Sequence, residues 1–162
     1  MAKMTIHGFD EYDTKLFELI NKSPDIVKKS IRAGAKVLAD AIRKALNALP
    51  TENFRYLRNG EKYKGPTEQE KTDLLNAFGI TPVSRGQSGD MNAKIGFDGY
   101  GSVPTKKYPQ GVPNPLVARS IESGSTVRVK TPFVRPTVNR HTKAAQEAMA
   151  QACDEEIANI MD

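Results

Sequence analysis

The feature that most restricts the fold is a row of apolar and small residues that recurs at spacings of three and four between residues 27 and 49. Its members are Val27, Ile31, Gly34, Leu38, Ile42, Ala45 and Leu49. This period matches one face of an α-helix, and most basic residues of the stretch fall on other faces. A helix over roughly residues 24–48 must bury that face, so the pattern predicts a domain built around one long rod.

The helix carries signals at its ends and in its interior. Ser23, Pro24 and Asp25 match a helix start, with a capping residue, a proline at the first position and an acid at the second. We therefore expect an earlier helix to stop near Ser23 and Pro50 to close the long one. Gly34 costs about 1 kcal/mol relative to alanine in a helix interior. Its place in the stripe indicates close backbone approach by another element.

A second long helix is expected after a proline-rich corner. The segment KTPFVRPTVNR, residues 130–140, places Phe133 and Arg135 between Pro132 and Pro136. Each proline fixes its own φ and biases the preceding residue toward extended geometry. We expect a rigid strand-to-helix corner in which Phe133 fills a hole in this subunit or its neighbour and Arg135 projects outward to pair with an acid. The stripe of the helix that follows consists of Val138, Thr142, Ala145, Met149, Cys153, Ile157 and Ile160.

The stretch FRYLRNGEKYKG, residues 54–65, predicts a protruding hairpin within a variable arm at about residues 50–66. Asn59 and Gly60 are the preferred pair for a type I′ turn. The arm interleaves aromatic and basic side chains, among them Phe54, Arg55, Tyr56, Arg58 and Tyr63. Such residues can stack on nucleic-acid bases. The alternative is a solvated or subunit-contacting arm, because an isolated hairpin is marginal in water.

The remaining pattern predicts short strands and two short helices. Strands are expected at residues 3–7, 80–83, 93–97 and 125–131, and a flexible loop at residues 84–90. One short helix begins at Pro66–Thr67 and is closed by Gly79; the other is capped by Asn114 and closed by Gly124. A Gly/Pro-rich loop spans about residues 98–114. The expected fold is α+β: one domain over residues 1–162, with a small antiparallel sheet packed against the long amphipathic helix.

Composition argues against several classes of protein. The start MAKMTIHGFDEYD has no apolar signal region, and no apolar run approaches the roughly 18 residues of a membrane span. Cys153 is the only cysteine, which excludes an internal disulfide and favours a small buried side chain. His7 and His141 stand outside any metal-ligand spacing, and no serine or paired acid has a catalytic context. We expect no enzyme, no metal and no cofactor.

Charge is unevenly distributed around a formal net value of +5. Residues 28–64 hold ten bases and three acids, and residues 106–143 hold eight bases and one acid, Glu122. The tail over residues 154–162 has four acids and no base. These blocks can pair within the chain, pair between copies, or form a solvated surface. The basic blocks also permit contact with nucleic acid.

The corner and its surroundings resemble a known family. ARSIESGST (residues 118–126), a short strand, TPFVRPTV (residues 131–138) and a long terminal helix follow one another here. This order resembles the neck, or tail-completion, proteins of long-tailed bacteriophages, the family named for the tenth gene product of HK-type lambdoid siphophages. The matching positions are Glu122, Gly124, Pro132, Phe133, Arg135 and Pro136. The start, MTIHGFDEYDTKLFEL, is similar too, whereas residues 50–90 depart from the family pattern.

The resemblance implies a structural virion protein at the head–tail junction, made in the host cytoplasm. It implies a homo-oligomeric ring, six-fold or twelve-fold, around the channel through which DNA passes. Its partners would be the connector, neck and tail proteins, with no membrane, catalysis or cofactor. A ring needs two different contact faces on each subunit, and the unlike charge blocks are compatible with that. The alternative is a nucleic-acid-binding protein that uses its basic stretches; a small hydrolase or toxin has no positive support.

Overall fold

The computed structural model describes residues 9–161 and has an α+β fold, as predicted. Its elements in chain order are α1 (Phe9–Asn47), α2 (Glu68–Ala77), β1 (Phe78–Ile80), β2 (Ser84–Arg85), β3 (Met91–Asn92), β4 (Ile95–Phe97), α3 (Asn114–Ser123) and α4 (Val134–Met161). The strand expected at residues 3–7 lies outside the described residues.

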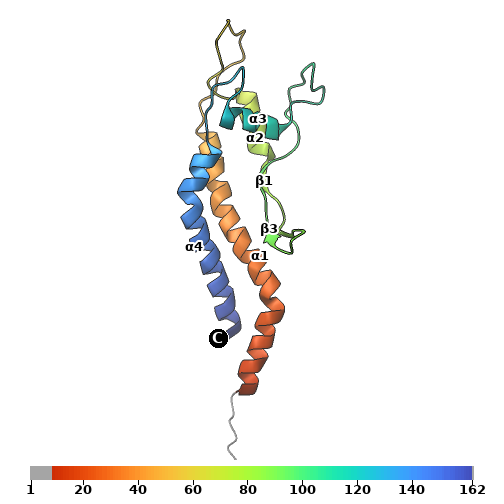
Figure 1. Ribbon diagram of the computed structural model, residues 1–162, viewed down its shortest axis with the longest axis vertical. Helices are drawn as coiled ribbons and strands as arrows, with labels where there is room; N and C mark the ends of the chain where they lie inside the picture. The colour runs from red at the N-terminus through yellow and green to blue at the C-terminus, as the bar shows by residue number, and fades with distance from the viewer. Residues whose placement is uncertain (1–8, 162) are drawn as a thin grey trace, which may run out of the picture.

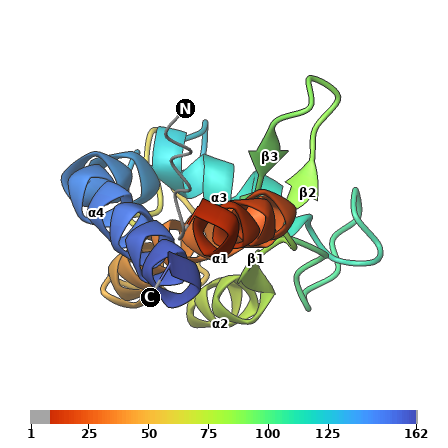
Figure 2. The same cartoon turned by 90° about the horizontal axis from the view of Figure 1, so that it is seen from below.

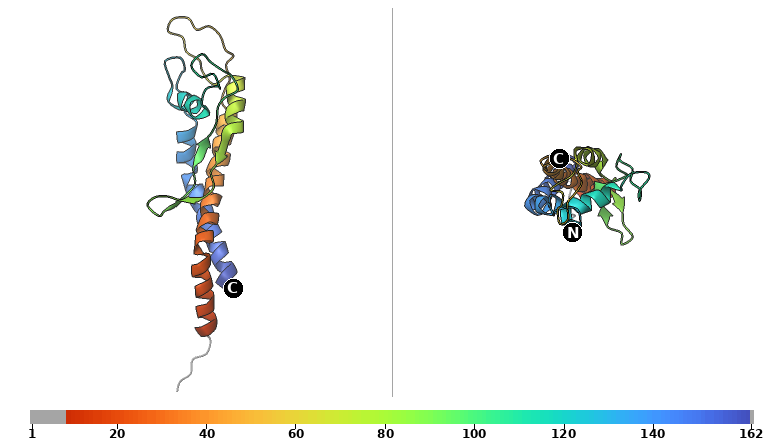
Figure 3. Two further views of the ribbon diagram at one scale, coloured as in Figure 1. Left: turned by 90° about the vertical axis from the view of Figure 1, so that its right-hand side faces the viewer. Right: turned by 90° about the horizontal axis from the view of Figure 1, so that it is seen from above.

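The long helices α1 and α4 lie side by side and run in opposite directions along the molecule (Figure 1). α1 continues past the C-terminal end of α4, where the Lys15 ammonium donates to the Met161 carbonyl at 2.8 Å. The short helices α2 and α3 gather at the other end, where α1 finishes and α4 starts (Figures 1 and 3). We call this region the wide end, and the fold is a two-helix rod attached to it.

The main core lies in the wide end. Its centre consists of three fully buried side chains, Leu46, Leu74 and Ile121, one from each of the first three helices. Phe133 is also buried, and its ring centroid lies 6.2 Å from that of Phe97, which in turn lies 5.1 Å from Phe78. The corner aromatic therefore fills a hole in its own chain, one of the two roles expected for it.

The rod is held together by close approach of α1 and α4 at Gly34. A Cβ placed on Gly34 would lie 2.5 Å from Met149 Cγ and 3.0 Å from the Ala145 carbonyl oxygen. Ala145 is buried in the same seam. The glycine thus offsets its cost in helix propensity by letting α4 pack directly on the α1 backbone, as its position in the stripe indicated.

Substitution Gly34→Ala tests this close approach. The change raises helix propensity by about 1 kcal/mol, yet overpacking costs about 1–3 kcal/mol, so we expect a net loss of about 1 kcal/mol in urea unfolding. Met149→Ala in the same chain removes the nearest obstacle. The double variant should therefore be more stable than the sum of the single effects predicts. If the two effects on the free energy of unfolding simply add, or if Gly34→Ala is more stable than the wild type, the α1–α4 seam has room for the extra methyl group.

The expected break at Ser23 is wrong, because α1 runs through Pro24 without interruption. A proline inside a helix leaves the carbonyl four residues earlier without its backbone donor. Here that carbonyl belongs to Ile20, and the Ser23 hydroxyl donates to it at 2.8 Å. Ser23, which was expected to cap a new helix, therefore satisfies a backbone carbonyl inside a continuous one.

The strands form two antiparallel pairs. β1 pairs with β4 in the register Phe78↔Phe97, Gly79↔Gly96 and Ile80↔Ile95. Ile95 and Phe97, within the strand expected at residues 93–97, both pack against the core. β2 pairs with β3, so residues 84–92 form a short hairpin that includes the loop expected at residues 84–90. This hairpin lies on the side of α1 away from α4 (Figures 1 and 2).

Several expected boundaries differ. Gly79 lies in β1 and does not cap α2, and the strand expected at residues 80–83 begins two residues earlier. Pro113, not Asn114, occupies the N-cap of α3, because the Asn114 amide donates to the Asp98 carbonyl at 2.9 Å. The strand expected at residues 125–131 is reduced to a single bridge between Arg128 and Tyr63. Gly124 does end α3, with φ of 77°.

Candidate assembly surfaces

The proline corner is organised by Glu122. Its carboxylate accepts the backbone N–H groups of Phe133, Val134 and Arg135 at 2.7, 2.8 and 3.0 Å. These are the free donors at the start of α4, where a negative charge also favours the helix dipole. A side chain at the end of α3 therefore serves as the cap of α4, and it locks the angle between the two helices.

The environment of Glu122 acts on its acidity in two directions. Partial burial raises the pKa, and the hydrogen bonds from Val134, Arg135 and Phe133 lower it by more, so the pKa of the carboxyl lies below its ordinary value. The ionised form is thus the one that the corner stabilises.

The other residues of the resemblance surround this cap. Gly124 has φ of 77°, and a Cβ there would lie 3.1 Å from the Lys130 backbone nitrogen and 3.3 Å from the Arg128 carbonyl oxygen. Pro132, Pro136 and Arg135 are exposed, so Arg135 projects outward as expected. The ion pair with an acid that was expected for its side chain does not form among residues 9–161. The Arg135 backbone contacts the one acid of the region, Glu122. All six positions thus lie within one corner, and Phe133 anchors it to the core.

A second polar cluster, missed by the sequence analysis, joins α2 to the loop after α3. Thr67 and Glu70 form a capping box: the Glu70 backbone N–H donates to the Thr67 hydroxyl at 3.2 Å, and the Thr67 N–H donates to the Glu70 carboxylate at 2.8 Å. Arg128 Nη2 donates to both oxygens of that carboxylate at 2.9 Å. The Thr-x-x-Glu spacing was visible in the sequence as a capping box; the arginine, 58 residues away, was not.

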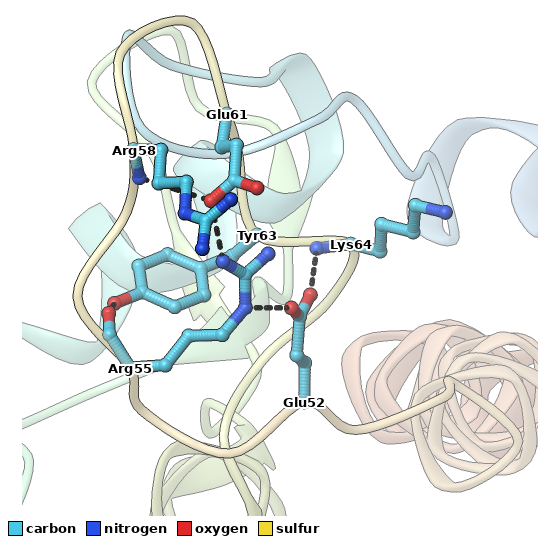
Figure 4. Close-up of polar contacts among 6 residues, drawn as sticks. All are labelled: Glu52, Arg55, Arg58, Glu61, Tyr63 and Lys64. Atoms are coloured by element: carbon cyan, nitrogen blue, oxygen red, sulfur yellow. Dashed lines mark hydrogen bonds and ion pairs between the residues drawn. The ribbon is translucent and has the colours of Figure 1, made fainter.

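The arm, residues 50–66, extends from the wide end and is held by ion pairs (Figures 1 and 4). Arg55 lies between two acids, at 3.0 Å from Glu52 and 2.6 Å from Glu61. Glu52 also accepts the Lys64 backbone N–H at 2.6 Å, and Glu61 accepts that of Arg58 at 2.9 Å. These hydrogen bonds are the leading cause that lowers the pKa of each acid.

The expected hairpin is wrong in its details. The arm has no regular strand pair, and its turn has a positive φ at Gly60 alone, the pattern of type II and not of type I′. The base of the arm pairs instead with the loop after α3: the Tyr63 N–H donates to the Val127 carbonyl at 2.9 Å and the Val129 N–H donates to the Tyr63 carbonyl at 2.8 Å. The arm is therefore fixed to the body at its base.

Two aromatic rings of the arm face solvent. Tyr56 is 94% exposed and Phe54 is 76% exposed. Phe54 stacks on Tyr63 with ring centroids 6.0 Å apart, and the Tyr63 hydroxyl donates to the Arg55 carbonyl. Exposed rings on a braced segment cost little entropy when they bind a protein surface, so this part of the arm is suited to a contact.

A hollow of about 510 Å³ opens between the arm, α2 and the Gly/Pro-rich loop. Phe54, Val103 and Val112 give it an apolar wall. Its acids are already engaged: Asp73 accepts the Ser102 N–H at 2.8 Å and Glu70 holds Arg128. With an apolar wall and acids that already accept hydrogen bonds, this hollow is better suited to contact with another protein segment than to acid–base chemistry.

A second apolar surface lies on α1, toward the end of the rod that is opposite the wide end. Phe17 and Ile20 are 68% and 65% exposed, and Pro24 and Val27 are exposed beside them. Val27 was expected on the buried face of the helix, but the neighbouring Ile26 is buried in its place. In the described range, residues 9–161, no group of three metal-ligating side chains is assembled. Nor is any helix of that range long and apolar enough to cross a bilayer.

Comparisons with models of protein families, with curated proteins and with solved structures find no match to this chain.

Proposed function

We propose that this chain is a structural subunit of a bacteriophage head–tail junction that assembles as a ring between the capsid connector and the tail. The observation that carries the proposal is the corner. Glu122, Phe133 and Arg135, which stand at positions resembling the neck-protein motif, form one rigid joint between α3 and α4. A joint of this kind sets the direction of a long rod relative to a small body, as a ring subunit requires.

The surface supports an assembly role more than a catalytic one. Exposed apolar side chains occur at both ends of the molecule, on the arm and on α1. A closed ring needs two unlike contact faces on each copy, and surfaces at opposite ends can serve neighbours in different layers of the junction. The arm, with Phe54 and Tyr56 outermost, is the part that we assign to a virion neighbour.

Coexpression with the connector and tail-end proteins of the same phage tests the proposal. We expect native mass measurement to give a complex with six or twelve copies of this chain. Phe54→Ser together with Tyr56→Ser should reduce recovery of the complex at least about tenfold, because exposed aromatic anchors dominate such contacts. The control is Lys143→Ser, at a side chain on α4 that is 89% exposed. A chain that ignores every neck, connector and tail partner would exclude the assignment.

The alternative, nucleic-acid binding, draws on the same arm and is less well supported. Arg55, its central cation, is already paired with Glu52 and Glu61. A binder that neutralises phosphates must lose affinity steeply as salt rises. Retention of the chain on duplex or single-stranded DNA at about 50 mM salt, with a steep salt response, would favour this alternative over the structural one.

A further inference from the structure

We propose that the exposed stripe on α1 is a two-fold contact between two copies of this chain, with the two α1 helices antiparallel. The stripe consists of Phe17, Ile20, Pro24 and Val27. This pairing goes beyond the proposed function and does not depend on it.

The stripe faces away from the rest of the rod. Residues on the opposite side of the helix contact α4: Ile26 is buried, and the Lys29 ammonium lies 2.7 Å from the Glu156 carboxylate. Spacings of three and four between stripe residues keep them on one face. A second helix can therefore lie along the stripe without meeting α4.

The stripe is symmetric in a way that suits an antiparallel pair. Phe17 and Val27 each lie five positions from residue 22, and Ile20 and Pro24 each lie two positions from it. When two such helices cross antiparallel at residue 22, Phe17 meets Val27 of the second copy and Ile20 meets Pro24. One surface thus complements itself, which is the condition for a two-fold contact.

The surface next to Val27 can receive the phenylalanine. A hollow of about 360 Å³ lies between α1 and the β2–β3 hairpin. It is lined by Ser23, Pro24, Val27, Arg85, Asp90 and Met91. In the antiparallel pair, Phe17 of each copy arrives at this hollow of the other, so its exposed ring gains an apolar seat against Val27 and Met91.

Charge favours the same direction. Residues 11–20 carry three acids and one base, whereas residues 22–36 carry five bases and one acid. An antiparallel pair sets the acidic part of each α1 beside the basic part of the other. It brings Asp13 within about one helical turn of Lys28, which also pairs with Asp25 of its own chain at 3.1 Å. A parallel pair would align like charges. Complementary charge therefore selects the second copy, in this orientation, as the occupant.

Disulfide trapping in the full-length chain tests the pairing. The variant Phe17→Cys, Val27→Cys, Cys153→Ser has two thiols ten residues apart, about 15 Å along one helix. That separation prevents an internal bridge, because bridged Cα atoms lie within about 7 Å. On mild oxidation we expect a covalent dimer and nothing larger. The control Glu11→Cys, Lys22→Cys, Cys153→Ser, on the opposite face, should stay monomeric.

Three results would overturn the pairing: no dimer, equal dimer in the control, or a ladder of larger species, which would indicate head-to-tail contact. A charge exchange gives an independent measurement by sedimentation equilibrium. Asp13→Lys and Lys28→Asp should each weaken dimerisation about three- to tenfold, and the double exchange should restore it. Both the trapping and the sedimentation experiments use the isolated chain. If they show no dimer, the proposed neck function is unaffected. If the chain fails to bind neck proteins, the proposed dimer is likewise unaffected.

Discussion

Replacement of Glu122 by alanine should lower the free energy of unfolding by about 3 kcal/mol, measured by urea denaturation at neutral pH. The substitution removes the acceptor of three backbone N–H groups at once, those of Phe133, Val134 and Arg135. Two of these groups are partly buried, so water replaces the lost acceptor incompletely. The effect should exceed that of an ordinary helix cap, because the same carboxylate joins α3 to α4.

The pH dependence of this contribution follows from the direction of the pKa shift. The pKa of Glu122 is lower in the folded chain than in the unfolded one, where it lies near 4.3. The contribution is therefore complete above that value and is lost as pH falls through the folded pKa. Glu122→Gln lacks the charge, so the stability difference between wild type and this variant should be constant from about pH 7 to 5.5 and shrink below about pH 4.

A control substitution at another glutamate distinguishes the effect of the Glu122 cap from the effect of removing any one carboxylate. Glu147 lies on α4, with its closest cation, Lys143, at 3.9 Å. Glu147→Gln should change stability by less than about 0.5 kcal/mol at any of these pH values. An equal effect at both positions, or a difference at Glu122 that grows in acid, would show that the corner does not depend on the ionised carboxylate.

The long elements were the most predictable part of the fold. The stripe from Val27 to Leu49 has a period that only a helix satisfies, and Gly34 within it marked the closest packing of the rod. The break at Ser23 was mispredicted because Ser-Pro-Asp fits both the start of a new helix and a continuous helix in which the Ser23 hydroxyl donates to the Ile20 carbonyl. Packing of α1 on α4 favours the continuous helix. Tertiary context overrides propensity in such cases.

The candidate surfaces were only partly predictable. Sequence reasoning placed the corner and the protruding arm, but it could not pair Glu122 with the start of α4, because the two are joined by a loop whose path depends on Gly124. It also missed the link from Glu70 to Arg128, since no local pattern reports a partner 58 residues away. Hydrogen bonds between distant segments follow from the packed fold and not from the period of either segment.

That missed link should be the most costly to break. Arg128 has a side chain only 9% exposed, against 27% for Glu70, so the arginine depends more on its partner than the acid does. Its second terminal nitrogen, Nη1, has no hydrogen-bond partner among residues 9–161. Glu70→Ala should therefore cost about 4 kcal/mol, since it strands a buried charge and opens the capping box of α2.

The reverse substitution should be milder. Arg128→Met keeps an apolar stem of similar length and leaves Glu70 able to reach solvent while it still accepts from the Thr67 N–H, so we expect a loss of about 2 kcal/mol. The double variant should cost much less than the sum of the two, because each single change removes the same pair. Asn76→Ala, six residues away on α2 and exposed, is the control and should cost less than about 0.5 kcal/mol.

Loss of the Glu70–Arg128 ion pair should also loosen the attachment of the arm. Arg128 lies in the loop that pairs with Tyr63 through Val127 and Val129, so a loosened arginine releases the base of the arm from the body. Hydrogen exchange in Glu70→Ala should therefore rise at the Tyr63 and Val129 amides well before global unfolding, while the α1–α4 seam stays protected. If exchange rises equally in all three places, the pair stabilises the whole fold and the arm has no separate dependence on it. If the arm alone responds, its attachment, and with it the surface assigned to a virion neighbour, is set by one buried ion pair.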